Sequence, residues 1–219
     1  MLDNTIINKA KIYINNELVG LCSAHDMYHI ERVYDNSIKI FEGEQDGDEL
    51  VIGLGAVFHE MLDEKFFQGK KENQIKKIND FLNSIELTDT QKEKIIFIIE
   101  NIGYGKSLSG KTINKFIEFQ IVEEADRLDA IGAIAIARTF AYGGKIKRPI
   151  YEPNQKPIEN MTCEQYYRAE SHSINHFYEK LLKLKDKMKT KVGKQIATER
   201  HIFMEKYLEQ FFAEWKGER

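Results

Sequence analysis

Residues 51–64, VIGLGAVFHEMLDE, join an apolar run to a cluster of ionisable side chains. His59 and Glu60 stand side by side, and Asp63 and Glu64 follow about one helical turn later. Asp63 is four residues after His59, so a helix through this segment places both on one face. Two interpretations are open for this cluster. It is either a solvated helix start or a metal site with an acid–base pair.

The overall composition is that of a globular domain. The 219 residues are 42% hydrophobic and 31% charged, which argues against a disordered or fibrous chain. A formal charge of −3 gives no general attraction to nucleic acid or anionic membranes. The apolar runs are far shorter than the roughly 20 residues that span a bilayer, and no signal peptide is visible. The separated Cys22 and Cys163 predict reduced thiols. We therefore expect a cytoplasmic protein without a membrane partner.

The spacing of the apolar residues predicts an all-α protein. All prolines lie within residues 149–157, so the strongest helix breaker is missing elsewhere. Amphipathic helices are predicted from apolar stripes at residues 74–87, 88–102, 173–188 and 199–215. Thr88 and Thr90 are candidate N-caps of the second of these helices. Residues 143–162 are expected to form a loop, with room for a short hairpin. At a mean length of about 11–12 residues, roughly eight to ten helices are expected in one domain.

A basic run extends from residue 180 to residue 194. We interpret it as the solvated face of the C-terminal helices, because Glu179, Asp186 and Glu199 interrupt or flank it. The alternative is a helical nucleic-acid-binding or scaffold protein, which would rest on this run alone. We therefore do not expect a nucleic-acid partner.

Two short motifs fail when their full patterns are examined. The HExxH motif of zinc proteases needs a second histidine where this chain has Asp63. The stretch GYGKS, residues 103–107, lacks the earlier glycine of a phosphate-binding P-loop, because Glu100 occupies that place. Neither motif predicts a function.

Residues 121–138, IVEEADRLDAIGAIAIAR, are expected to form a buried helix with carboxylates at its start. Buried carboxylates must be solvated, paired or bound to a cation. Helix capping explains one acid well, but the segment carries Glu124, Asp126 and Asp129 close together.

Four blocks in order carry a resemblance to the HD-domain phosphohydrolase superfamily: AHDMYHIERV, HEMLDEKFF, EADRLDAIGAIAIAR and SINHFYEKLLKLKDKM. The chain is similar to small, single-domain bacterial members over residues 20–217. The resemblance implies an all-α HD-domain fold for residues 1–219. It implies a metal-site core at about 20–145 and a C-terminal helical pair at about 165–217.

The resemblance also implies the residues of a metal site. His29 matches the first histidine ligand, His59 the second and Asp126 the final aspartate. Glu60 stands where the family has an aspartate, and Glu124 also replaces a common aspartate. Asp63 and Glu64 occupy the places of two catalytic acids, whose role would be to orient water or relay a proton.

A mixed nitrogen and oxygen ligand set suits a transition metal better than Ca²⁺. We expect a divalent cofactor, with Mn²⁺ favoured and Mg²⁺, Ni²⁺, Fe²⁺ and Zn²⁺ as other candidates. Glu is a good oxygen ligand, so the departure at Glu60 either shifts a working site or weakens it.

The resemblance implies a nucleotide or another phosphorylated small molecule as substrate, with release of pyrophosphate or phosphate. Arg32, Lys65 and Lys106 are candidate phosphate-binding residues; for each lysine, a solvated surface charge is the competing interpretation. The alternative function is a nucleotide sensor whose catalysis Glu60 has weakened. We expect a monomer or a homodimer.

Overall fold

The computed structural model describes residues 4–17, 27–62, 71–108, 113, 115–159, 161–162, 164–165 and 171–219. Within these ranges the secondary structure is entirely helical, which confirms the predicted all-α class. The α-helices are α1 (Asn4–Glu17), α2 (Met27–Glu44), α3 (Glu49–Phe58), α4 (Lys71–Asn83), α5 (Asp89–Asn101), α6 (Tyr104–Ser107), α7 (Ile117–Asp129), α8 (Ala133–Lys145), α10 (Ser173–Glu179) and α11 (Lys191–Trp215). None of these helices is both long and apolar enough to cross a lipid bilayer.

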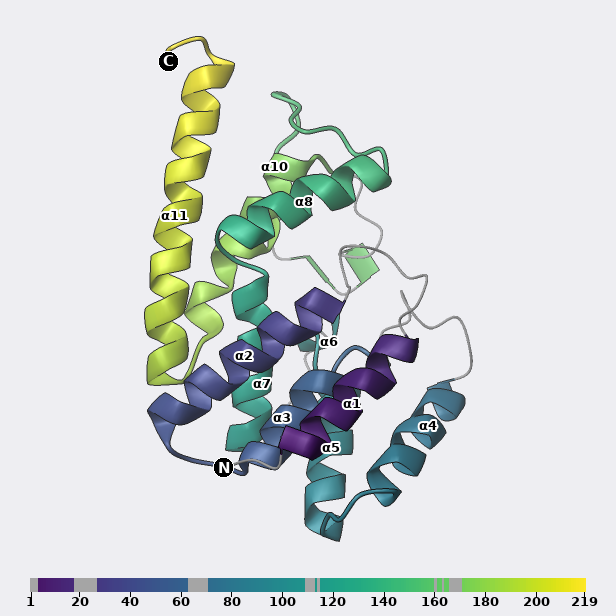
Figure 1. The fold of residues 1–219 in the computed structure, drawn as a ribbon. Coiled ribbons are helices and arrows are strands. Elements are labelled where there is room, and N and C mark those ends of the chain that lie inside the picture. The colour runs from purple at the N-terminus through teal and green to yellow at the C-terminus, as the bar shows by residue number, and fades with distance from the viewer. Residues whose placement is uncertain are drawn as a thin grey trace.

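The apolar helix α3 contacts α1, α2, α5 and α7, which surround it in the lower half of the view (Figure 1). Residues 51–58 of α3 are all buried. A Cβ atom at Gly53 would lie only 2.8 Å from Ile7 Cδ1, so this glycine lets α1 approach closely. The Asp48 carboxylate begins α3 by accepting hydrogen bonds from backbone N–H groups of the first turn, at 2.9 and 3.2 Å. His59, which directly follows α3, therefore lies in the interior of the protein.

The prediction of one continuous helix over residues 121–138 is wrong. Helix α7 ends at Asp129 and α8 begins at Ala133. Between them, Gly132 has a φ of +88°, and a Cβ atom there would lie 3.0 Å from the side chain of Arg200. The apolar residues keep helical spacing on both sides of the break, so periodicity alone does not reveal it.

The C-terminal segment also departs from the prediction of one helix over residues 173–188. Helix α10 ends at Glu179 and is followed by two 3-10 turns, Leu181–Lys183 and Lys185–Lys187. Leu181, Leu184 and Met188 remain buried. In the predicted loop over residues 143–162, α8 continues to Lys145, and the described part of the loop contains no strand that could form a hairpin.

The predicted cap at Thr88 is confirmed. Its hydroxyl accepts a hydrogen bond from the backbone N–H of Gln91 at 3.2 Å, and the Gln91 side chain accepts one from the backbone N–H of Thr88 at 2.9 Å. This reciprocal capping box fixes the start of α5.

Glu124 joins α7 to the start of α11. Its buried carboxylate accepts hydrogen bonds from the backbone N–H of Lys189 at 2.5 Å, the backbone N–H of Thr190 at 3.2 Å and the Thr190 hydroxyl at 2.5 Å. These donors lie just before the first turn of α11, where the helix dipole also favours a negative charge. Glu124 is thus committed to holding α11 against α7.

We expect Glu124→Gln to lower the free energy of unfolding by about 1–3 kcal/mol, because an amide is a weaker acceptor and adds a buried donor. Urea denaturation measures the change. Glu86→Gln, at an exposed position, is the matched control and should change stability by less than about 0.5 kcal/mol. Equal effects of the two substitutions would contradict the structural role of Glu124.

Candidate metal centre

Three of the four predicted metal ligands bring their ligand atoms together in the structure. His29 lies in the first turn of α2, His59 directly follows α3 and Asp126 lies near the end of α7. One ligand atom from each residue lies within 4.8 Å of the others. His29 and His59 are buried, whereas the Asp126 side chain is 28% exposed. Asp126 is therefore the solvent-facing member of the group.

The distances within this group match those around a shared cation. His29 Nε2 lies 3.2 Å from His59 Nε2 and 3.7 Å from Asp126 Oδ1, and His59 Nε2 lies 4.0 Å from the same oxygen. Ligand atoms about 2.1 Å from one ion lie about 3.0 Å apart at right angles and about 4.2 Å apart on opposite sides. The residues present therefore fit a divalent metal with mixed nitrogen and oxygen ligands.

Both imidazoles are oriented by the ring nitrogen that faces away from the group. His59 Nδ1 donates to the Ala56 backbone carbonyl at 2.7 Å, and His29 Nδ1 donates to Asp129 Oδ2 at 2.6 Å. These acceptors engage Nδ1 of each ring, so Nε2 is the nitrogen that each ring turns toward the common point. Such outer hydrogen bonds fix the orientation and basicity of histidine ligands.

Glu60 lies beside the same group. Its Oε1 atom is 3.3 Å from His29 Nε2, and the residue is buried. The longer side chain of glutamate thus still reaches the histidine from the position that follows His59. Its assignment as a fourth ligand stays a prediction.

The buried carboxylates make the two histidines electrostatically different. Burial would by itself lower the pKa of His29, but Glu60, Asp129 and Asp126 outweigh it and raise this pKa to about 9. Burial lowers the pKa of His59, and the nearby His29 adds to this effect. A cation that binds both rings therefore replaces a proton held on His29.

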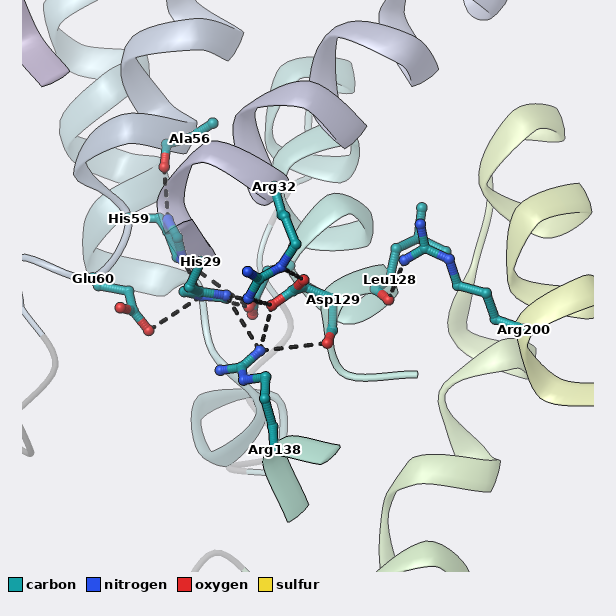
Figure 2. A network of polar contacts seen from close by, with 10 residues as sticks. His29, Arg32, Ala56, His59, Glu60, Leu128, Asp129, Arg138 and Arg200 are labelled. Atoms are coloured by element: carbon teal, nitrogen blue, oxygen red, sulfur yellow. Dashed lines mark hydrogen bonds and ion pairs between the residues drawn. The ribbon is translucent and has the colours of Figure 1, made fainter. Parts of the chain in front are cut away.

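Asp129 supports the group from behind, and sequence reasoning did not assign it this role. Its 2%-exposed carboxylate accepts from His29, from Arg32 Nε at 2.5 Å and from Arg138 Nη1 (Figure 2). Burial alone would raise the pKa of Asp129, but its hydrogen bonds with His29 and Arg32 hold this pKa well below its usual range. The available signal was the spacing of Asp126 and Asp129, three residues apart on one helix.

One further basic residue contacts Asp129, and another contacts the residue before it. Arg138 reaches it from α8 because the chain turns back after α7. Arg200, on α11, donates to the Leu128 carbonyl at 2.5 Å and satisfies the last turn of α7 (Figure 2). Neither arginine was singled out from the sequence, because their partners come together only when α8 and α11 fold onto α7.

The other predicted site residues are placed differently. Arg32 contacts Asp129, and its side chain is 34% exposed, so its phosphate-binding role stays a prediction. Lys106 is exposed, and its Nζ lies 3.4 Å from the Ile99 carbonyl. Asp63, Glu64 and Lys65 lie outside the described residues.

A cavity of about 420 Å³ lies next to Asp129 and Arg32, bordered by α2, α11 and the turn that joins α7 to α8. Asp129 contacts Nδ1 of His29, whereas Nε2 of this ring faces His59. The cavity therefore lies on the Asp129 side of His29. It is separate from the point where the ligand atoms of His29, His59 and Asp126 meet, and we call these three residues the metal group.

Comparison with known proteins identifies relatives of the chain by sequence and by structure. No protein-family model matches the chain. An uncharacterized protein of Bacillus subtilis, YpgQ, is 30% identical over 203 residues, which is 91% of this chain and 89% of YpgQ. A solved structure from Lactobacillus plantarum has a TM-score of 0.84 and 33% identity, covering 99% of this chain and 100% of the other.

One of two further solved structures indicates the class by its name. An HD-superfamily hydrolase from Bacillus thuringiensis has a TM-score of 0.77 and 36% identity, covering 97% of this chain and 98% of its own. The structure of B. subtilis YpgQ in complex with ADP has a TM-score of 0.71 and 27% identity, and the match covers 94% of this chain and 95% of YpgQ. The chain belongs to the HD superfamily of hydrolases, which confirms the resemblance seen in the sequence.

We expect Asp129→Asn to weaken Mn²⁺ binding by about tenfold to a hundredfold, because the amide no longer fixes the His29 ring as a charged acceptor. Isothermal titration calorimetry measures the affinity. Asp35→Asn, an equal change at an exposed position of α2, should leave it unchanged. Unaltered affinity in Asp129→Asn would rule out the supporting role, and no Mn²⁺ binding by the unsubstituted protein would rule out the metal centre.

Proposed function

We propose that this protein is a metal-dependent phosphohydrolase that acts on nucleotides or related phosphoesters and phosphoanhydrides. The observation that carries the proposal is the convergence of His29, His59 and Asp126 on one point. Membership of a hydrolase superfamily supports the reaction class. The ADP complex of YpgQ supports nucleotides as the substrate class. Release of pyrophosphate from nucleoside triphosphates is the specific reaction proposed, and removal of phosphate from deoxynucleoside monophosphates is the second.

In this proposal the ligands are His29, His59, Glu60 and Asp126. A bound divalent ion supplies Lewis acidity, which lowers the pKa of water and polarises a phosphoryl group. The chain's contribution is preorganisation. Asp129 and the Ala56 carbonyl fix the two imidazoles, and the partly exposed Asp126 marks the side from which a substrate enters.

The proton-transfer step is assigned to residues outside the described ranges. Asp63 or Glu64 orients the attacking water or passes a proton to the leaving group, as the family pattern implies. Arg32, Lys65 and Lys106 are proposed to meet the phosphate charge. Arg32 can do so with the 34% of its side chain that remains exposed beside Asp129. Mn²⁺ is the favoured ion because the ligand set combines imidazole nitrogen with carboxylate oxygen.

The second candidate function is a nucleotide sensor with weakened catalysis. The observation behind it is Glu60, whose extra methylene brings its carboxylate to 3.3 Å from His29 Nε2. This contact occupies a nitrogen that the metal also needs. We favour the enzyme, because a glutamate carboxylate can bind the metal through the same oxygen.

The purified protein with Mn²⁺ should release pyrophosphate or phosphate from at least one member of a panel of nucleotides. Asp126→Asn should reduce this turnover by at least about a hundredfold, because it removes an anionic ligand. Asp35→Asn should retain it. Binding of Mn²⁺ without turnover on any nucleotide would contradict the enzyme and support the sensor, for which a nucleotide should raise the melting temperature without product formation.

Glu60→Asp should lower kcat by about tenfold, because the shortened side chain withdraws its carboxylate from the position for which the surrounding site is built. Glu72→Asp, at an exposed position of α4, is the control. Steady-state rates at saturating Mn²⁺ measure both variants. A rise in kcat for Glu60→Asp would instead indicate that glutamate has weakened an ancestral aspartate site.

A further inference from the structure

A second cavity, of about 590 Å³, lies on a different face of α7 from the metal group. It is open to solvent on one side and is bordered by α7, the end of α6 and the 3-10 turns that follow α10. The described residues that line it are Ser107, Lys115, Gln120, Glu123, Glu124, Arg127, Asp186, Lys187 and Lys189. Ser107 ends the GYGKS stretch, which now has a structural context unrelated to a P-loop.

Two of the basic residues share one buried carboxylate. Lys115 Nζ lies 2.8 and 2.7 Å from the two oxygens of Glu123, and Arg127 Nη2 lies 2.7 Å from Oε1 of the same residue. Arg127 and Glu123 are 9% and 6% exposed. One carboxylate therefore neutralises only part of this charge.

The remaining acidic residues of the lining do not neutralise the rest of the positive charge. Glu124 is committed to the donors at the start of α11. Asp186 is exposed to solvent. The cavity lining therefore has an excess of positive charge. It comes from the partly buried Lys115 and Lys187 and the buried Arg127.

Lys187 lines the cavity with a partly buried ammonium group. Its ammonium lies 5.4 Å from the centre of the Tyr104 ring, and among the described residues no carboxylate comes within ion-pair distance of it. Arg127 Nη1 donates to the Lys187 carbonyl at 3.3 Å, which holds the two basic residues together. The neighbouring Lys180 also lies over Tyr104, at 4.9 Å. Crowded, partly buried cations of this kind are stabilised by a multivalent anion.

We propose that this cavity is a phosphate-binding site, in which Lys187 and Arg127 hold a phosphate or pyrophosphate group. Lysine and arginine are the usual side chains for such groups, and Ser107 adds a hydroxyl to the lining. Burial and the adjacent Arg127 guanidinium lower the pKa of Lys187, as expected where several cations line one cavity.

The position of the site on α7 leaves two sources for the phosphate. Arg127 directly follows Asp126, and consecutive helical residues point about 100° apart. The site thus lies around the helix from the metal group. It can hold a phosphate of the same nucleotide, which rests on the proposed function, or a separate phosphorylated molecule, which does not.

The first test is inorganic pyrophosphate binding to full-length protein from which metal has been removed by a chelator. Calorimetry should detect saturable binding, and Lys187→Gln should weaken it by about tenfold or more, because one charge-assisted contact is lost. Lys187→Arg should retain most of the affinity. Lys185→Gln is the matched control, since Lys185 lies in the same 3-10 turn but does not line the cavity.

Equal pyrophosphate affinity in the unsubstituted protein, Lys187→Gln and Lys185→Gln would overturn the proposal, as would the lack of any saturable binding. Urea denaturation of each variant separates a lost site from a lost fold. These outcomes do not depend on catalysis, so failure of the hydrolase proposal leaves this test intact.

Kinetics of the Mn²⁺-loaded protein then distinguish the two sources. If the cavity holds a substrate phosphate, Lys187→Gln should raise KM by about tenfold with a smaller change in kcat. If it holds a separate molecule, KM and kcat should stay unchanged while pyrophosphate binding by the metal-free protein is lost.

Discussion

The geometry of the candidate metal centre depends on the buried carboxylate of Asp129. Three elements meet at this group, because His29 and Arg32 come from α2, Arg138 comes from α8 and Asp129 itself ends α7. A buried carboxylate without such partners would be strongly destabilising. With them, it fixes the ring of His29 and hence the direction of its lone pair. The same interaction thus holds the helices together and orients a ligand.

The central helix α3 imposes a complementary constraint. Its apolar residues are buried on all sides, so the helix has little freedom to shift or rotate. His59 follows immediately and is held by the Ala56 carbonyl at 2.7 Å. One histidine is therefore placed by apolar packing and the other by an ion-pair network. Their Nε2 atoms meet at 3.2 Å although the residues are 30 positions apart in sequence.

The sequence predicted the helical class, the Thr88 cap and the three residues whose ligand atoms meet, because these depend on periodicity, local hydrogen bonding and recognisable residue patterns. It did not predict the end of α7 at Asp129, since apolar spacing continues through the break at Gly132. It also did not predict the roles of Asp129, Arg138 and Arg200, because their contacts join residues of different helices. The roles of Asp63 and Glu64 stay predictions.

The link between Glu124 and α11 has a consequence for how the protein is made. Glu124 is two residues before Asp126, yet its hydrogen-bond donors are at residues 189 and 190, more than sixty positions downstream. During synthesis on the ribosome, α7 emerges long before these donors. Until they arrive, the Glu124 carboxylate lacks the hydrogen bonds that it accepts in the complete fold. We therefore expect α7, which carries Asp126, to reach its final position only after the start of α11 has been translated.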